Sequence, residues 1–320
     1  MLLPALAFCL GLALLVWSAD RFVAGAAATA HRAGIAPLTV GLIVIGVGTS
    51  APEMLVSALA AWQQSPGLAV GNAVGSNIAN IGLVLGATAV VMPLTVRSQT
   101  LRREFPILLL VIAVAGALLA DGVLGRGDGL ILSLGFAAVL AVMAGLGRQA
   151  PGRDPLGEEF ARELSDGLRI RAALVWLAVG LVSLLLASRV VVWGATSIAR
   201  ALEVSELVIG LTIVAVGTSL PELAASVASA LKREPDLAIG NLLGSNMFNL
   251  LPVLALPGLI APASLDAGVL RRDYPLMMLF TAVLFVMALA RRGDARVSRW
   301  EGAALLMGFI AYQTLLYVSA

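Results

Sequence analysis

The sequence predicts an all-α polytopic membrane protein, with ten transmembrane helices arranged as two inverted-topology five-helix repeats. Of its 320 residues, 60% are hydrophobic and 12% are charged, whereas a soluble domain carries about half and about a quarter. The chain also divides into ten apolar segments, and a shift of 169 residues places one half on the other. This composition excludes a soluble enzyme, a secreted disulfide scaffold and a nucleic-acid-binding protein.

The ten apolar segments end at charged or Pro/Gly-rich breaks. A membrane-spanning helix needs about 20 mostly apolar residues. We expect spans at 2–27, 37–62, 68–92, 103–120, 127–147, 170–198, 205–231, 236–260, 274–290 and 298–319. The first span lacks a basic leading segment and is too long for a cleaved signal. The expected units are a first repeat over 1–147, a short linker over 148–169 and a second repeat over 170–320.

The loops between these spans are asymmetric in basic residues. Fifteen Lys and Arg residues fall on the side of the central linker, and four fall on the side of the two termini. Basic residues gather in cytoplasmic loops. We therefore expect a multi-pass protein of the plasma (inner) membrane, with the linker in the cytoplasm and both termini extracellular or periplasmic.

The internal repeat is the most informative feature of the sequence. GLIVIGVGTSAPE (41–53) aligns with GLTIVAVGTSLPE (210–222), and GNAVGSNIAN (71–80) aligns with GNLLGSNMFN (240–249). Over 41–86 against 210–255, 21 of 46 positions are identical. Five spans are an odd number, so the second half enters the membrane from the opposite side. Inverted repeats are frequent in secondary transporters, which bind substrate near the midplane between the repeats.

Each repeat places a glutamate inside the membrane at the same position, Glu53 and Glu222. A charged side chain at the bilayer centre costs about 3 kcal/mol on insertion scales, so an ionisable residue there indicates a functional site. Pro52 and Pro221 each remove a backbone N–H and free the carbonyl four residues earlier. Irregular backbone at this depth is tolerated where it is buried or lines a cavity. Carboxylates beside free carbonyls predict an oxygen-rich cation site.

Helical spacing gathers further polar groups around each glutamate. Thr49 and Ser50 lie four and three residues before Glu53 and share its helix face, and Thr218 and Ser219 repeat this arrangement before Glu222. The following span of each half carries an Asn-Ser-Asn ladder at four-residue spacing: Asn72, Ser76 and Asn80, then Asn241, Ser245 and Asn249. Such residues can also join membrane helices by hydrogen bonds. Their occurrence at equivalent positions favours a role as ligands.

All candidate ligands are oxygen atoms. The single cysteine, Cys9, and the single histidine, His31, exclude a multi-cysteine or histidine-based metal centre. Oxygen ligands select Ca²⁺, Na⁺, Mg²⁺ or H⁺. Ca²⁺ takes about six to eight oxygens, whereas Mg²⁺ retains its water. Two carboxylates neutralise one Ca²⁺, and neutral hydroxyls suit Na⁺, so competition for the same charges would couple the movements of the two ions.

At these residues the sequence resembles the prokaryotic sodium/calcium exchangers of the calcium:cation antiporter (CaCA) superfamily. The paired GTSxPE and GNxxGSNxxN stretches match the two alpha-repeats of that family. The resemblance implies a secondary antiporter that exchanges three Na⁺ for one Ca²⁺ by alternating access, as the long first and sixth helices slide past a fixed core. It implies no enzyme activity, no cofactor and no obligatory protein partner. The expected partners are Ca²⁺, Na⁺ and the lipid bilayer, with no nucleic acid.

The resemblance also implies roles for single residues. The central Ca²⁺ site would consist of Glu53, Glu222 and the carbonyls of Thr49 and Thr218. One Na⁺ site would consist of the Gly46 carbonyl, Thr49, Ser50, Glu53 and Ser76. Its outward counterpart would consist of the Ala215 carbonyl, Thr218, Ser219, Glu222 and Ser245. Asn80 and Asn249 would border the centre.

Three departures from the family pattern refine this expectation. Asn249 stands where some relatives carry aspartate, which weakens the case for K⁺ co-transport. Gly46 replaces the alanine usual in relatives, which leaves a backbone ligand but adds flexibility. The short linker excludes the large calcium-sensing domains of animal exchangers.

Other functions remain open on the sequence. An H⁺/Ca²⁺ exchanger could use the same two glutamates, because two close carboxylates can carry protons, although related proton-coupled exchangers carry GNxxE-type motifs instead. A passive channel would carry flux without a counter-ion. GRGD at 125–128 fits the short motif of intramembrane aspartyl proteases, but no second aspartate lies at matching depth. Asp20 and Arg189 coincide under the shift and are interpreted as interfacial anchors near opposite faces.

Overall fold

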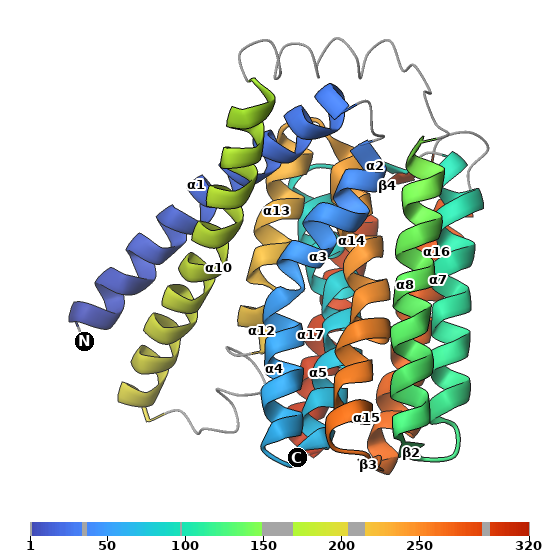
Figure 1. The fold of residues 1–320 in the computed structure, drawn as a ribbon. Helices are drawn as coiled ribbons and strands as arrows, with labels where there is room; N and C mark the ends of the chain where they lie inside the picture. The colour runs from blue at the N-terminus through green and yellow to red at the C-terminus, as the bar shows by residue number, and fades with distance from the viewer. Residues whose placement is uncertain are drawn as a thin grey trace.

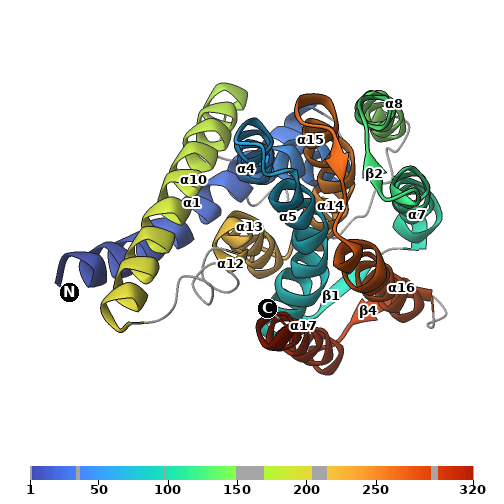
Figure 2. The same ribbon diagram turned by 90° about the horizontal axis from the view of Figure 1, so that it is seen from below.

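The computed structural model describes residues 2–33, 37–96, 98–148, 169–203, 215–289 and 295–319. Two helices of 32 residues each, α1 (Leu2–Ala33) and α10 (Ile170–Ala201), begin the two repeats. They pack along one another and lie beside the remaining helices as a separate tilted pair (Figure 1, Figure 2). The helix α1 runs past its expected end at 27, so His31 and Arg32 lie in its last turn rather than in a loop.

The other four spans of the first repeat follow in the expected order. The second span consists of α2 (Pro37–Val40), the π-helix η1 (Gly41–Ile45), α3 (Gly46–Thr49) and α4 (Ala51–Trp62). The third consists of α5 (Pro66–Ala79), the π-helix η2 (Asn80–Leu85) and α6 (Gly86–Val91). The fourth and fifth are α7 (Ser98–Leu119) and α8 (Arg126–Arg148).

The second repeat has the same order after α10. Its seventh span is described from α12 (Ala215–Thr218) through α13 (Leu220–Leu231), and its expected start at 205–214 lies outside the described residues. The eighth consists of α14 (Pro235–Phe248), the π-helix η4 (Asn249–Val253) and α15 (Leu254–Ile260). The ninth is η5 (Val269–Asp273) with α16 (Tyr274–Leu289), and the tenth is α17 (Arg299–Ser319). Residues 149–168 of the expected linker also lie outside the described part.

Length and hydropathy identify six helices in the described ranges that can cross a membrane, and a seventh if the bent pair Gly41–Thr49 and Ala51–Trp62 is one span. The other expected spans have described helices that fall below these limits. Two of them are the apolar helices Glu104–Leu119 and Leu220–Leu231. The ten helical segments nevertheless follow the predicted order. The lower number reflects a bent second span, shorter apolar helices and, for the seventh span, a start that lies outside the described residues.

The inverted relation of the repeats is visible at the two ends of the bundle. The short strand β1 (Leu94–Val96) pairs antiparallel with β4 (Ala295–Val297) at one end. The strand β2 (Val123–Leu124) pairs with β3 (Ala263–Ser264) at the opposite end (Figure 1). Because β1 and β3 are equivalent under the shift of 169, equivalent segments face opposite sides of the molecule.

The crossing of α1 and α10 follows the same two-fold relation. A Cβ atom on Gly25 would lie 2.5 Å from the backbone nitrogen of Leu177. On the equivalent Gly194, it would lie 2.9 Å from the backbone nitrogen of Phe8, and Phe8 is itself equivalent to Leu177. Glycine at these positions lets the two backbones touch, and each contact is the symmetry counterpart of the other.

The buried apolar residues form two clusters. The larger cluster joins the helices of the bundle and includes Phe105, Phe248 and Met277, but no described residue of α1 or α10. The smaller cluster centres on α1 and α10, with Phe22 and Leu184 fully buried, and it also includes buried residues of the second, seventh and eighth spans: Val40, Ile45, Ala225 and Leu237. The paired long helices therefore pack against the bundle through a cluster distinct from the larger one.

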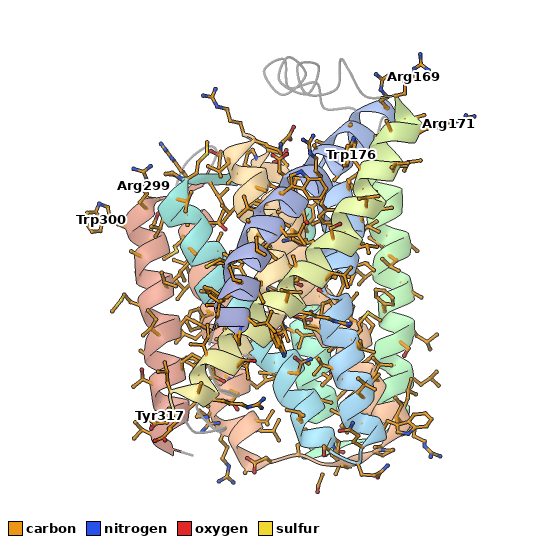
Figure 3. All side chains as sticks on the ribbon, turned by 90° about the vertical axis from the view of Figure 1, so that its left-hand side faces the viewer. Arg169, Arg171, Trp176, Arg299, Trp300 and Tyr317 are labelled. Atoms are coloured by element: carbon orange, nitrogen blue, oxygen red, sulfur yellow. The ribbon has the colours of Figure 1, made fainter. Side chains whose placement is uncertain are left out.

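Charged and aromatic side chains mark the ends of the helices. Arg169 and Arg171 lie at one end of α10, and Arg299 and Trp300 lie at the end of α17 on the same side of the molecule (Figure 3). Tyr317 lies at the opposite end of α17 (Figure 3). Arginine, tryptophan and tyrosine are typical of membrane–water interfaces, so these side chains indicate where the bilayer boundaries lie.

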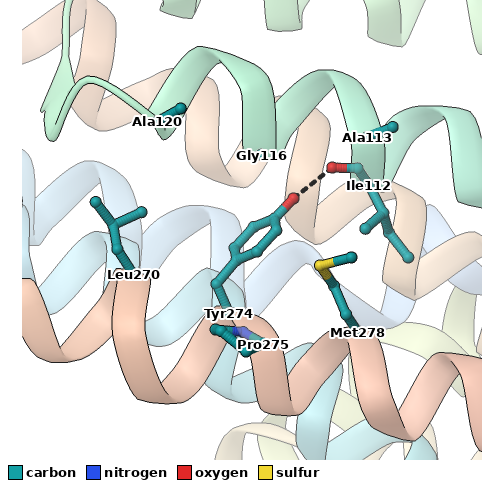
Figure 4. A pocket seen from close by; sticks show the side chains of 8 residues that line it. All are labelled: Ile112, Ala113, Gly116, Ala120, Leu270, Tyr274, Pro275 and Met278. Atoms are coloured by element: carbon teal, nitrogen blue, oxygen red, sulfur yellow. Dashed lines mark hydrogen bonds between the residues drawn. The ribbon is translucent and has the colours of Figure 1, made fainter.

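A groove of about 480 Å³ lies between α7 and α16, away from the polar centre. The hydroxyl of Tyr274 donates to the carbonyl of Ile112 across it, and the ring lies against Gly116 (Figure 4). A Cβ atom at Gly116 would lie 3.0 Å from this ring. The lining is apolar apart from the tyrosine hydroxyl and includes none of the predicted cation ligands.

Candidate cation site

The second and seventh spans break at equivalent serines. Ser50 has φ −81° and ψ 4°, and Ser219 has φ −88° and ψ 3°, so neither is helical. Pro52 and Pro221 follow in the first turn of the new helix, where proline is well tolerated. In the first repeat, the two helical parts meet at 45°. The sequence therefore predicts both the existence and the position of the breaks.

One of the carbonyls freed by the prolines has a visible side-chain partner. The hydroxyl of Ser188 on α10 donates to the carbonyl of Gly217 at 3.0 Å. Gly217 lies four residues before Pro221, as the missing N–H requires. This bond joins the long helix α10 to the broken seventh span.

The two glutamates are almost completely buried. The exposed fraction is 1% for Glu53 and 2% for Glu222. The Oε2 atom of each has no hydrogen-bond partner within the described part of the chain. The carboxylates come from opposite repeats. A buried carboxylate needs compensation by hydrogen bonds or an opposite charge, so these free oxygens are suited to a bound cation.

Hydroxyl groups near the glutamates make contacts between the repeats. The Ser50 hydroxyl donates to Glu222 Oε1 at 3.4 Å. The Thr49 hydroxyl lies 3.0 Å from the side-chain oxygen of Asn241 and 3.5 Å from the hydroxyl of Ser245. The family resemblance groups Ser245 with Thr218, whereas the structure places it beside Thr49. The oxygen groups are therefore shared between repeats.

The first asparagine of each ladder holds the backbone of a glutamate. Asn72 Nδ2 donates to the Glu53 carbonyl at 3.1 Å, and Asn241 Nδ2 donates to the Glu222 carbonyl at 3.2 Å. Each also donates to a serine hydroxyl one turn beyond its glutamate, at 3.3 and 2.9 Å respectively. These asparagines position the two glutamates, and ladder spacing alone could not separate this role from that of a ligand.

The remaining predicted ligands occupy the same region. Ser76 is buried, and Ser219 is buried with a hydroxyl that lacks a partner among the described residues. Thr218 is partly buried at the end of α12, and Ala215 begins that helix. The asparagines Asn80 and Asn249 are buried and begin η2 and η4. Single π-turns frequently occur at functional sites.

The departure at Gly46 has a packing explanation. A Cβ atom there would lie 3.1 Å from the ring of Phe248 and 3.2 Å from the backbone of Gly244. At Gly244 itself, a Cβ atom would lie 2.2 Å from the carbonyl oxygen of Leu42. The second span thus packs backbone to backbone against α14, and the large Phe248 takes the space that an alanine at 46 would need.

Two further asparagines, Asn77 and Asn246, which are not among the predicted ligands, also lie at this centre. Asn80 Nδ2 donates to Asn246 Oδ1 at 3.1 Å, and Asn249 Nδ2 donates to Asn77 Oδ1 at 3.2 Å. Their signal was present, since each follows the serine of GSN in both copies of the motif. They lie off the four-residue ladder, which is why helical spacing did not select them.

The chemistry of the centre is two carboxylates among neutral oxygens. Within the described ranges, no group of three or more His, Cys, Asp or Glu side chains could hold a metal ion. Such an arrangement lacks the ligands of a transition-metal centre and offers the oxygen ligands that Ca²⁺ and Na⁺ use.

Comparison with known proteins identifies the family. The sequence profile of the sodium/calcium exchanger protein family matches residues 3–145 and 172–318. The chain belongs to this family. It is 48% identical to the putative antiporter CaxA of Alkalimonas amylolytica over 319 residues, with 100% of each chain covered. It is 43% identical to the inner membrane protein YrbG of Escherichia coli K12, covering 99% of this chain and 98% of that protein.

Solved structures of an exchanger share the fold. The chain superposes on the sodium-calcium exchanger NCX_Mj soaked with 2.5 mM Na⁺ and 1 mM Sr²⁺, with a TM-score of 0.84, 31% identity and 98% of each chain covered. The exchanger family and this fold confirm the predicted all-α inverted-repeat architecture. The chain is a multi-pass membrane antiporter that exchanges another cation for Ca²⁺. It is a transporter rather than an enzyme, and its family indicates no cofactor.

Proposed function

We propose that this exchanger couples the movement of Na⁺ in one direction to the movement of Ca²⁺ in the other, and that one Ca²⁺ binds between Glu53 and Glu222. The observation that carries the proposal is a pair of buried carboxylates, one from each repeat, each with an oxygen that lacks a hydrogen-bond partner in the described structure. The carbonyls of Thr49 and Thr218 are the proposed neutral ligands. Together they give an oxygen cage of the kind that Ca²⁺ prefers.

The Na⁺ sites are proposed to be built across the repeats. The contacts of Thr49 with Ser245 and of Ser50 with Glu222 favour one site that also uses the Gly46 carbonyl. Its counterpart follows from the repeat symmetry and uses the following ligands: the Ala215 carbonyl, Thr218, Ser219, Ser76 and Glu53. Na⁺ bound at these sites neutralises the carboxylates that Ca²⁺ needs. The two ions therefore compete for the same charges, and this competition couples their movements.

The proposed stoichiometry of three Na⁺ for one Ca²⁺ follows the family resemblance. One net charge then crosses the membrane per cycle, which is worth about 2.3 kcal/mol per 100 mV. Transport is therefore proposed to be electrogenic. Proton coupling by the same two glutamates is the alternative that the experiment below must distinguish.

For alternating access we propose that α1 and α10 move as a pair against the bundle, because most of their buried apolar residues belong to the smaller cluster and none belongs to the larger cluster of the bundle. We place the repeats at 1–147 and 170–320, joined by a cytoplasmic linker over 148–169. Both termini then lie on the extracellular or periplasmic side of the inner membrane. The basic asymmetry of the loops supports this orientation, and one relative is named an inner membrane protein.

The test is uptake of radioactive Ca²⁺ into proteoliposomes loaded with Na⁺, K⁺ or acid. We expect uptake only with the outward Na⁺ gradient, and faster uptake when a positive interior drives Na⁺ out. Uptake driven only by the acid load would reassign the coupling ion to H⁺. Uptake without any counter-ion would contradict antiport.

A further inference from the structure

Four buried asparagines join the two repeats at the centre of the protein. Asn77 and Asn80 belong to the first repeat, and Asn246 and Asn249 are their equivalents under the shift of 169. Each is at most 2% exposed. The two hydrogen bonds among them, Asn80 to Asn246 and Asn249 to Asn77, both cross between repeats and are symmetry counterparts.

An asparagine amide has one end that can bind a cation and one that cannot. Its Oδ1 accepts, whereas its Nδ2 only donates. In Asn249 the Nδ2 end is occupied by Asn77 Oδ1, and Oδ1 is buried without a partner among the described residues. The hydrogen bond with Asn77 therefore determines that the oxygen end of the Asn249 amide is free.

We propose that Asn77 is a positioning residue of the cation site, which fixes the amide of Asn249 so that its oxygen serves the bound ion. This inference rests on the proposed function. Asn246 has the equivalent role towards Asn80. Neither Asn77 nor Asn246 contacts the ion itself, and each acts through the side chain of the opposite repeat.

The two arms differ in their second anchor. Asn77 Nδ2 donates to the sulfur of Met277 on α16 at 3.4 Å, so both ends of Asn77 are held. The equivalent of Met277 is Leu108 on α7, which offers no acceptor. Asn246 Nδ2 has no partner within the described ranges. The arm from Met277 through Asn77 to Asn249 is fully oriented, and the arm from Asn246 to Asn80 is anchored less firmly.

The main test is a double-mutant cycle on transport by proteoliposomes, with the half-saturating Ca²⁺ concentration and the maximal rate measured separately. Asn77→Ala removes the acceptor, so the Asn249 amide is free to turn its Nδ2 towards the ion. We expect the half-saturating Ca²⁺ concentration to rise about tenfold, with a smaller change in maximal rate. Asn249→Ala should give a similar rise, and the double variant should be no worse than Asn249→Ala alone.

Additive effects in this cycle would overturn the proposal, because they would mean that Asn77 acts without Asn249. Met277→Leu keeps the side-chain volume and removes only the sulfur that accepts from Asn77. It therefore tests the inference even if Asn77→Ala fails to fold. We expect Met277→Leu to shift the half-saturating concentration in the same direction by a smaller factor. An unchanged half-saturating Ca²⁺ concentration in both Met277→Leu and a correctly folded Asn77→Ala protein would contradict the inference.

The opposite arm supplies the matched control. Asn246→Ala should have a smaller effect than Asn77→Ala, and Leu108→Met, which introduces an acceptor at the equivalent place, should not weaken Ca²⁺ transport. A larger effect of Asn246→Ala would reject the proposed asymmetry. Failure of the proposed function itself would be distinct, since the unmodified protein would then show no Na⁺-driven Ca²⁺ uptake.

Discussion

The two repeats agree at the cation site and differ immediately around it. Glu53 and Glu222, with the helix breaks before them, have equivalent geometry. The residues that pack around them differ between the repeats. Gly46 packs against Phe248, whereas the equivalents of these residues are Ala215 and Ala79. The two buried glutamates are thus preserved by the duplication, while the residues packed around them differ between the repeats.

The long helices differ in the same manner. Asp20 on α1 forms an ion pair with Lys232 at the end of α13, with 2.6 Å between the charged atoms. The equivalent positions hold Arg189 and Gln63, which cannot form the same pair. Asp20 was expected to be only an interfacial anchor, and the structure gives it a specific partner. Similarly, Ser188 binds the Gly217 carbonyl, while its equivalent Ala19 has no hydroxyl to do so.

The largest expected effect tests what the repeats share. Glu53→Gln and Glu222→Gln each keep the side-chain shape but remove one of the two charges that are proposed to neutralise Ca²⁺. Each should reduce Na⁺-driven Ca²⁺ uptake to the level of empty liposomes. Glu203→Gln, which changes an exposed glutamate beyond α10, is the matched control and should transport normally. Normal Ca²⁺ flux in either buried variant would reject the assignment of the site.

This shared part is also what the sequence could predict. Buried glutamates, adjacent prolines and hydroxyls at helical spacing occur twice, and duplication separates them from incidental polar residues. The contact partners could not be predicted, because Asn72 has the same sequence signal whether it binds an ion or the Glu53 carbonyl. The cross-repeat contact of Thr49 with Ser245 depends on how helices pack, which spacing along one helix does not contain.

Helix ends were predicted less well for a related reason. The sequence after residue 27 is rich in alanine and contains no proline or glycine before Gly34. Nothing in it stops the helix, so α1 continues to Ala33. The expected end marked where the apolar run fades, and a helix can extend beyond the membrane boundary.

An intermediate effect tests the difference in packing. Gly46→Ala should destabilise the protein by about 1–3 kcal/mol, because overpacking a well-filled site costs that much. The ring of Phe248 is packed edge-on against Phe136 at 5.4 Å between centroids, so it cannot easily move aside. Thermal unfolding in detergent measures the change.

The matched variants sharpen this comparison. Phe248→Leu in the Gly46→Ala background should restore part of the lost stability by making room. Ala215→Gly, at the equivalent position, should cost only about 0.5–1 kcal/mol, the helical penalty of glycine. Equal losses from Gly46→Ala and Ala215→Gly would mean that Phe248 does not explain the glycine.

The smallest effect concerns the ion pair between the long helix and the bundle. Asp20→Asn and Lys232→Gln should each change stability by no more than about 1 kcal/mol, because ion pairs at the protein surface contribute little. The double variant should behave as either single variant does. Measured unfolding temperatures at low and high salt would reveal a stronger pair, since the difference between variants would then exceed this range and shrink with salt.

The central claim is that the two repeats build one shared Ca²⁺ site rather than one site each. Isothermal titration calorimetry of Ca²⁺ binding to the purified protein in detergent tests it most directly. We predict one Ca²⁺ per chain, displaced by Na⁺, with binding lost in both Glu53→Gln and Glu222→Gln. Two Ca²⁺ per chain, with one retained in each glutamine variant, would contradict it.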